Sequence, residues 1–106
     1  MKQEIIEYLK KQIGDDDPDM PEALYNEYCN AVAEKLHELE APLASGDFAL
    51  MGSVAHALKG NAAMVGDNEI YPHALAFEKG AKNSKDLDVC KAEFAAISNI
   101  ASQMKE

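Results

Sequence analysis

The sequence predicts an all-α protein, namely an antiparallel up-down-up-down four-helix bundle with a short extra N-terminal helix. Two observations support this fold class. Apolar residues recur every three or four positions along most of the chain, and no stretch alternates as a strand would. Glycine, proline and Asp/Asn clusters cut the chain into five segments joined by short turns, which favour antiparallel neighbours.

The chain has 106 residues, and we expect a single domain over residues 1–106. Within it we expect a bundle core over about 21–104, an N-terminal helix over 1–13 and a loop over 14–20. The sequence has neither an apolar run long enough to span a membrane nor a signal-peptide core, so we expect a cytoplasmic protein. A net charge of −9 disfavours binding to nucleic acid or to anionic membrane surfaces.

The first helix is predicted over Met1–Ile13, with Gly14 as its stop. The acidic run from Asp15 to Asp19 contains Pro18 and lacks the spacing of a calcium loop. We therefore interpret this run as a solvated loop rather than a cation site. The apolar stripe of the helix consists of Ile5, Ile6, Leu9 and Ile13.

The second helix is predicted to begin at Pro21, because proline suits the first turn of a helix. Pro42 sits within its pattern, so this helix should end or kink near Ala41. A turn follows at residues 45–47, and Asp47 can cap the third helix. The apolar stripe of the second helix consists of Leu24, Tyr28, Ala31, Val32, Leu36, Leu39 and Leu43.

Asp67 or Asn68 can cap the fourth helix, which is predicted to run to about Lys82. Residues 83–86 form the next turn, and the last helix is predicted from Leu87 to about Lys105. The apolar stripes are Ile70, Ala74, Phe77 and Ala81 in the fourth helix, and Cys90, Phe94, Ile97, Ala101 and Met104 in the last.

The two cysteines, Cys29 and Cys90, are far apart in the sequence and fall on apolar helical stripes. We expect buried free thiols rather than a disulfide or a metal site. The sequence leaves open whether the two residues approach each other in the fold.

The third helix, predicted over Phe48–Val65 and closed by Gly66, has an unusual outer face around His56. On a helical wheel His56 points away from the apolar stripe, and the only other charged side chain of this helix is Lys59. Each glycine inside a helix costs roughly 1 kcal/mol relative to alanine. A bare face around a histidine indicates that a partner docks there closely. The core-facing stripe is Met51, Val54, Leu58, Ala62 and Val65, and the small outer residues are Ala49, Gly52, Ser53, Gly60 and Ala63.

His56 is a candidate phosphoryl acceptor, because a neutral imidazole nitrogen is a good nucleophile near neutral pH. Lys59, one turn away, can screen the added charge of about −2, and Gly60 leaves room for an approaching active site. No phosphate-cradling loop and no carboxylate cluster for Mg²⁺ lies beside His56 in the sequence. A partner would therefore supply the metal and the transition-state stabilisation.

The other two histidines have plainer interpretations. His37 lies among acidic residues and is interpreted as a solvated surface residue. His73, next to Pro72 near the start of the fourth helix, is expected to be partly buried and to face another helix. Neither forms a metal-ligand spacing, so no metal site is expected. No hydrolase or nucleotide-binding motif occurs, and the chain is too short to hold an ATP site beside the bundle, so we expect no enzyme.

The stretch HALKGNAAMVG resembles the signature of histidine-containing phosphotransfer (HPt) domains, which is His-x-Leu-Lys-Gly, two small residues, two variable residues, an aliphatic residue and Gly. The pair Phe77-Glu78 is similar to the Leu-Glu pair that such domains often carry on the next helix. The resemblance covers about Pro21 to Met104. Asn61 replaces the commoner Ser or Ala, and Pro72 and His73 replace a plainly apolar stretch. The matching residues are His56, Leu58, Lys59, Gly60, Asn61, Ala62, Val65 and Gly66.

The resemblance implies a role in a phosphorelay. His56 would accept a phosphoryl group on Nε2 from an aspartate of a receiver domain, or from a hybrid sensor histidine kinase, and pass it to the receiver domain of a response regulator. This chain would bind no cofactor, since the receiver would supply Mg²⁺, an acidic cluster and a lysine. Lys59, Gly60 and Asn61 would contact or support the phosphoryl group. The docking face would consist of Ala49, Gly52, Ser53, Ala63 and Met64.

Two alternatives concern the same face. The chain could be an adaptor or antagonist that docks on receiver domains without phosphotransfer, although the retention of His56 with Lys59 argues against it. Met64 could equally be a core residue at the edge of the helix rather than a docking residue. No second large exposed apolar stripe is evident, so a monomer is expected.

Overall fold

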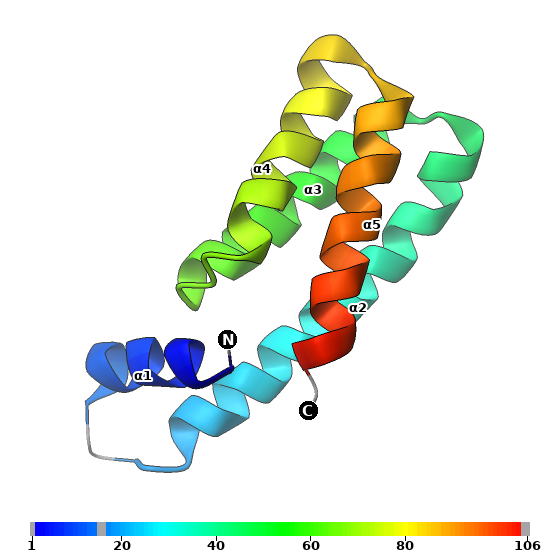
Figure 1. Ribbon diagram of the computed structural model, residues 1–106. Helices are drawn as coiled ribbons and strands as arrows, with labels where there is room; N and C mark the ends of the chain where they lie inside the picture. The colour runs from blue at the N-terminus through cyan, green and yellow to red at the C-terminus, as the bar shows by residue number, and fades with distance from the viewer. Residues whose placement is uncertain (1, 15–16, 105–106) are drawn as a thin grey trace.

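The computed structural model describes residues 2–14 and 17–104. Within those ranges the protein consists of helices and has no strand, so the all-α prediction is confirmed (Figure 1). The elements are α1 (Lys2–Ile13), α2 (Met20–Ser45), α3 (Phe48–Met64), α4 (Ile70–Lys79), the π-helical segment η1 (Gly80–Ser84) and α5 (Leu87–Met104).

Helices α2 to α5 pack around a shared core. Helix α2 packs against α3, α3 against α4, α4 against α5, and α5 against α2 (Figure 1). Helix α1 packs on the beginning of α2. The ring of Tyr8 on α1 also reaches the α3–α4 connection, because a Cβ added at Gly66 would lie 2.7 Å from that ring.

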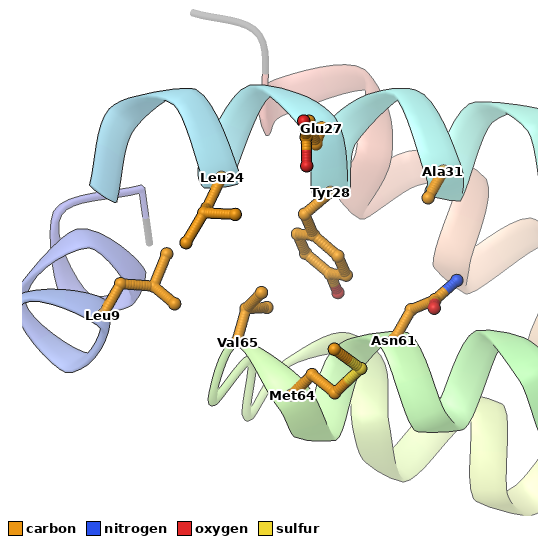
Figure 2. A pocket seen from close by; sticks show the side chains of 8 residues that line it. All are labelled: Leu9, Leu24, Glu27, Tyr28, Ala31, Asn61, Met64 and Val65. Carbon is orange, nitrogen blue, oxygen red and sulfur yellow. The ribbon is translucent and has the colours of Figure 1, made fainter. Parts of the chain in front are cut away.

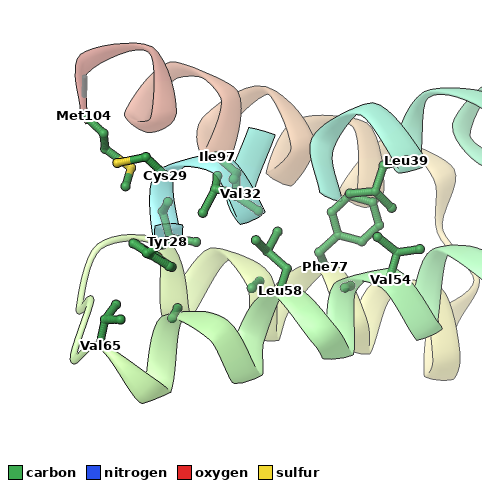
Figure 3. Packing of buried hydrophobic residues seen from close by; sticks show 14 of the residues in the cluster. Tyr28, Cys29, Val32, Leu39, Val54, Leu58, Val65, Phe77, Ile97 and Met104 are labelled. Atoms are coloured by element: carbon green, nitrogen blue, oxygen red, sulfur yellow. The ribbon is translucent and has the colours of Figure 1, made fainter. Parts of the chain in front are cut away.

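Apolar side chains from all five α-helices form the core. Figure 3 shows core residues from α2 to α5. The five residues predicted to line the inner face of α3 are all buried. Tyr25 on α2 is among the largest fully buried side chains although it was not expected in the stripe, and its hydroxyl donates a hydrogen bond to the Met104 carbonyl. Because the inner face of α3 is fixed by this packing, its opposite face with His56 is turned outward.

The second helix was predicted to end or kink near Ala41, and it does not end there, since α2 continues through Pro42 to Ser45. A proline removes one backbone hydrogen bond from a helix, and near the helix end that loss is small. Pro42 is buried, and its carbonyl accepts hydrogen bonds from the N–H groups of Gly46 and Asp47. Gly46 adopts a left-handed conformation with φ of +76° and ends the helix.

Both ends of α3 follow the predicted signals. The Asp47 carboxylate accepts a hydrogen bond from the Leu50 N–H at 3.1 Å, which is a helix N-cap. Helix α3 ends at Met64, with Val65 in the C-cap position and Gly66 in the left-handed conformation with φ of +68°. Asp67 then accepts hydrogen bonds from the N–H groups of Glu69 and Ile70 at the start of α4.

The fourth helix does not continue to Lys82 as a regular α-helix. Helix α4 ends at Lys79, and the wider π-helical turn η1 carries the chain to Ser84. Gly80 lies close to α5 at this point, because an added Cβ would lie 2.9 Å from Val89 Cγ1. The turn before α5 is therefore shorter than predicted and begins at Lys85, which has a φ of +48°.

Cys29 and Cys90 are buried free thiols, as predicted. Burial raises the pKa of the Cys90 thiol. The predicted helix start at Met1, the acidic residues Asp15 and Asp16, and the predicted helix end at Lys105 lie outside the described residues. In residues 2–14 and 17–104, no helix combines the length and the apolar character needed to cross a membrane.

Candidate functional site

The imidazole of His56 lies on the outer face of α3, with 64% of its side chain exposed. The neighbouring outer residues Ala49, Ser53, Gly60 and Ala63 are also exposed. All four are small, so the ring stands on an open surface that a second protein can reach.

The carboxylate of Glu78 on α4 contacts every other charged or titratable residue of this site. Its Oε2 lies 2.7 Å from Nδ1 of His56, and its Oε1 lies 2.7 Å from Nζ of Lys59. Nζ of Lys82 on η1 also donates to Oε2, at 2.9 Å. Only 10% of the Glu78 side chain is exposed. One nearly buried carboxylate thus holds a histidine and a lysine from α3 and a second lysine from η1.

The charges around Glu78 determine which nitrogen of His56 is free. The hydrogen bond from Lys59, with those from Lys82 and His56, lowers the pKa of Glu78 to about 2. The same carboxylate raises the pKa of Lys59. An ionised carboxylate only accepts hydrogen bonds, so Nδ1 of His56 is the donor. In neutral His56 the lone pair therefore lies on Nε2, which Glu78 leaves free.

The two glycines of α3 have different surroundings. At Gly60 an added Cβ would meet nothing within 4 Å, so this position is open as predicted. Gly52 was expected to be part of the bare docking face, and that expectation is wrong. The aliphatic chain of Lys82 covers Gly52, which is buried.

An apolar groove of about 310 Å³ lies between α1, α2 and the C-terminal end of α3 (Figure 2). Asn61 and Met64 of α3 line one side, and Figure 2 shows them across the groove from Ala31 and Tyr28 of α2, with Leu9 of α1 at the far end. The side chain of Met64 is 76% exposed, so it is not a core residue. Asn61 is half-buried at the groove wall.

His37 and His73 have the surroundings expected from the sequence. His37 is exposed, with Nδ1 3.6 Å from a Glu40 carboxylate oxygen. His73 faces α5, where its Nδ1 lies 2.9 Å from Oε1 of Glu93. In the described part of the chain, no group of three or more His, Cys, Asp or Glu side chains is arranged to hold a metal ion.

Two residues of this site were missed from the sequence as contacts of His56. Glu78 carried a signal, because the Phe77-Glu78 pair was matched to a family pattern, but no role was assigned to its carboxylate. Lys82 carried none, because its position depends on the π-helical turn and on the packing of η1 against α3. Among the predicted residues, His56 and Lys59 meet at Glu78, whereas Asn61 and Met64 lie at the groove.

Comparison with known protein families gives one match. The family model described as Hpt domain matches residues 23–106, which is more than half of the chain. No significant match was found among curated proteins or among solved structures.

Proposed function

Because this chain belongs to the Hpt domain family, we propose that it is a histidine phosphotransfer protein of a two-component phosphorelay, with His56 as the phosphoryl carrier. It takes the phosphoryl group from an aspartate of one receiver domain, or from a hybrid sensor histidine kinase, and delivers it to the receiver domain of a response regulator. The single observation that supports this role best is the hydrogen bond between Nδ1 of His56 and Glu78, at 2.7 Å, on an exposed face.

The chemistry follows from that hydrogen bond. The Nε2 lone pair of His56 attacks the phosphorus of the donor's aspartyl phosphate. The P–Nε2 bond forms, the P–O bond to the aspartate breaks, and the aspartate carboxylate leaves with the electron pair. The imidazole becomes positively charged as the bond forms, and Glu78 stabilises that charge through the Nδ1 proton. Transfer to the next receiver is the reverse of these steps.

The chain acts as a carrier and not as an enzyme in this proposal. It supplies the nucleophile and the positive charge of Lys59, and Gly60 leaves open space beside His56. Asn61, at the groove wall, would contact the docked receiver. The partner receiver supplies Mg²⁺ and the groups that stabilise the transition state. Hpt domains act with receiver domains as phosphate carriers, which is the family-level basis for this division of roles.

We further propose that the receiver docks over the open outer face of α3 and the adjoining groove. Ala49, Ser53 and Ala63 give a surface without protruding side chains, and Met64 offers an exposed apolar contact. We infer an antiparallel up-down-up-down arrangement for α2 to α5, which the ring of helix contacts supports. We also propose that the protein acts as a monomer in the cytoplasm.

The proposal is tested by phosphotransfer from a panel of phosphorylated receiver domains in Mg²⁺ buffer. The wild type is compared with His56→Gln, which keeps a side chain of similar size but has no nucleophilic imidazole. His73→Gln is the matched control, because His73 has a similar hydrogen bond from Nδ1 to a glutamate. We expect acid-labile, alkali-stable phosphate on the wild type and on His73→Gln but not on His56→Gln.

Two other outcomes would contradict the proposed function of His56. Binding to receivers without any transfer would favour the adaptor or antagonist function. Labelling of His56→Gln at the level of the wild type would show that another residue accepts the phosphoryl group.

A further inference from the structure

The side chain of Lys82 crosses the backbone of α3 at Gly52. A Cβ added at Gly52 would lie 2.8 Å from Cγ and 3.1 Å from Cε of Lys82, which is closer than van der Waals contact allows. Gly52 does not have a positive φ, so its backbone conformation does not require glycine. Glycine destabilises a helix interior relative to alanine, and the close passage of Lys82 gives a reason for glycine at this position.

The chain of Lys82 ends at the carboxylate that holds His56. Its Nζ lies 2.9 Å from Oε2 of Glu78, the same oxygen that accepts the Nδ1 proton of His56. About half of the Lys82 side chain is exposed, at 48%. Gly52 lies one turn before His56 on α3, so Lys82 passes over this helix next to the reactive histidine.

The backbone around Lys82 is held in place by packing. Lys82 belongs to the π-helical turn η1, and such turns occur frequently at functional sites. At the start of this turn, Gly80 packs closely on Val89 of α5. The turn is therefore fixed against α5 on one side and reaches α3 on the other.

We propose that Lys82 is a positioning residue that acts on His56 through Glu78, because it shares the Oε2 atom that accepts the Nδ1 proton and offsets part of the negative charge of that carboxylate. This inference rests on the proposed phosphotransfer function of His56. Lys82 also sets the charge of the site. With His56 neutral, Lys59 and Lys82 outweigh the single charge of Glu78, and they partly offset the charge of about −2 on a bound phosphoryl group.

Loss of the Lys82 charge should shift the pH dependence of the reaction at His56 toward higher pH. The charged groups that contact one another at His56 are Glu78 from α4, Lys59 from α3 and Lys82 from η1. Without Lys82, the negative charge of Glu78 is offset by Lys59 alone. Glu78 then favours the imidazolium form of His56 more strongly, and that form has no lone pair on Nε2. The nucleophile therefore appears only at higher pH.

The experiment measures how fast His56 reacts with potassium phosphoramidate, a small donor that needs no partner protein. The Nε2 lone pair forms the P–Nε2 bond, the P–N bond of the N-protonated donor breaks, and ammonia leaves with the electron pair of that bond. The rate at His56 is the difference between each protein and its His56→Gln derivative, measured from pH 5 to 9. Lys82→Met removes the charge but keeps an aliphatic chain, and Lys79→Met is the matched control. Lys79 is exposed on α4, and its loss changes the net charge of the protein equally.

For Lys82→Met we expect the rising limb of the pH profile to move up by about half to one pH unit, because the variant loses a positive charge that disfavours the imidazolium, and solvent screens part of that charge. At a pH on that limb the rate falls about three- to tenfold. Lys79→Met should follow the wild-type profile. Identical profiles for Lys82→Met and Lys79→Met would overturn the proposal.

A double-mutant cycle tests the passage over Gly52. Gly52→Ala should slow the reaction in the wild-type background, because the added methyl group displaces Lys82. In a Lys82→Ala background the same substitution should have no further effect. An equal effect in both backgrounds would show that Gly52 does not act through Lys82.

The failure of this inference can be told apart from failure of the proposed function. If phosphorylated receivers never label His56 but the phosphoramidate profiles differ as described, the phosphorelay function is wrong and the positioning role of Lys82 stands. If receivers label His56 but the profiles coincide, the positioning role is wrong and the phosphorelay function stands.

Discussion

The Tyr28 hydroxyl on α2 donates a hydrogen bond to the carboxylate of Asp67, and both residues are buried. Burial and the hydrogen bond to Asp67 raise the pKa of Tyr28, so the hydroxyl keeps its proton at any physiological pH. The other carboxylate oxygen of Asp67 accepts from backbone N–H groups at the start of α4. This pair joins α2 to the α3–α4 connection, at the end of the groove beside the His56 helix.

Replacing Tyr28 with phenylalanine should lower the free energy of unfolding by about 1–3 kcal/mol, because an oxygen of the buried Asp67 carboxylate loses its hydrogen-bond donor. Urea denaturation followed by circular dichroism measures this change. The matched control is Tyr71→Phe, since Tyr71 is exposed and should change stability by less than about 0.5 kcal/mol. Equal effects of the two substitutions would contradict a stabilising role for the Tyr28–Asp67 pair.

Glu78 should make the stability of the protein depend on pH in the acidic range. Its pKa is lowered from 4.5 to about 2, so its stabilising contribution is present above pH 4.5 and is lost as the pH falls toward 2. Glu78→Gln should therefore be less stable than the wild type by about 1–2 kcal/mol at pH 6. Solvent screens the ion pair between Glu78 and Lys82, because the Lys82 side chain is 48% exposed, so this pair contributes little to the difference.

The difference between the two proteins should shrink steadily between pH 5 and pH 2, measured by urea denaturation at several pH values. The exposed Glu34→Gln is the control and should differ little from the wild type at any pH. A difference for Glu78→Gln that stays constant down to pH 2 would rule out the charge of Glu78 as its cause.

Gly60→Ala should separate stability from function. The added methyl group meets nothing within 4 Å, and alanine favours a helix more than glycine does. The free energy of unfolding should therefore rise by up to about 1 kcal/mol. The same methyl group stands one turn from His56 on the open face, so transfer from a phosphorylated receiver should slow. The reaction with phosphoramidate should be unchanged, because the contacts of Glu78 remain. A more stable variant with unchanged receiver transfer would show that no partner approaches closely at Gly60.

Met64→Glu should weaken the binding of a receiver domain about tenfold, which corresponds to about 1.4 kcal/mol. Met64 is 76% exposed, so the substitution should leave the fold intact. Isothermal titration calorimetry with a receiver that transfers phosphate to the wild type measures the change. Ala95→Glu, at an exposed position of α5, introduces the same charge on another helix and is expected to bind as the wild type does. Equal weakening by both substitutions would indicate a general charge effect.

The sequence predicted the helices and the outward face of α3 because both depend on local periodicity. The stripe from Met51 to Val65 determines which side of α3 is buried, and His56 lies opposite to it. The caps at Asp47 and Gly66 are local signals as well, and they were confirmed.

The network around Glu78 could not be derived in the same way. Glu78 and His56 are 22 residues apart on different helices, so their contact depends on the register between α3 and α4. Lys82 depends in addition on the π-helical turn, and its cover over Gly52 explains why a glycine expected on a bare face is buried. Pro42 shows the same limit for α2, where burial of the proline ring outweighed a rule based on one lost backbone hydrogen bond.

Both native thiols are enclosed, and the Cys90 thiol also resists ionisation. Maleimide reagents react with thiolates, so the folded protein should label slowly at its own cysteines. A cysteine introduced at an exposed position such as Ala95 would then react selectively with a fluorophore. The protein is thus suited to fluorescence experiments that follow complex formation in real time without removal of Cys29 or Cys90.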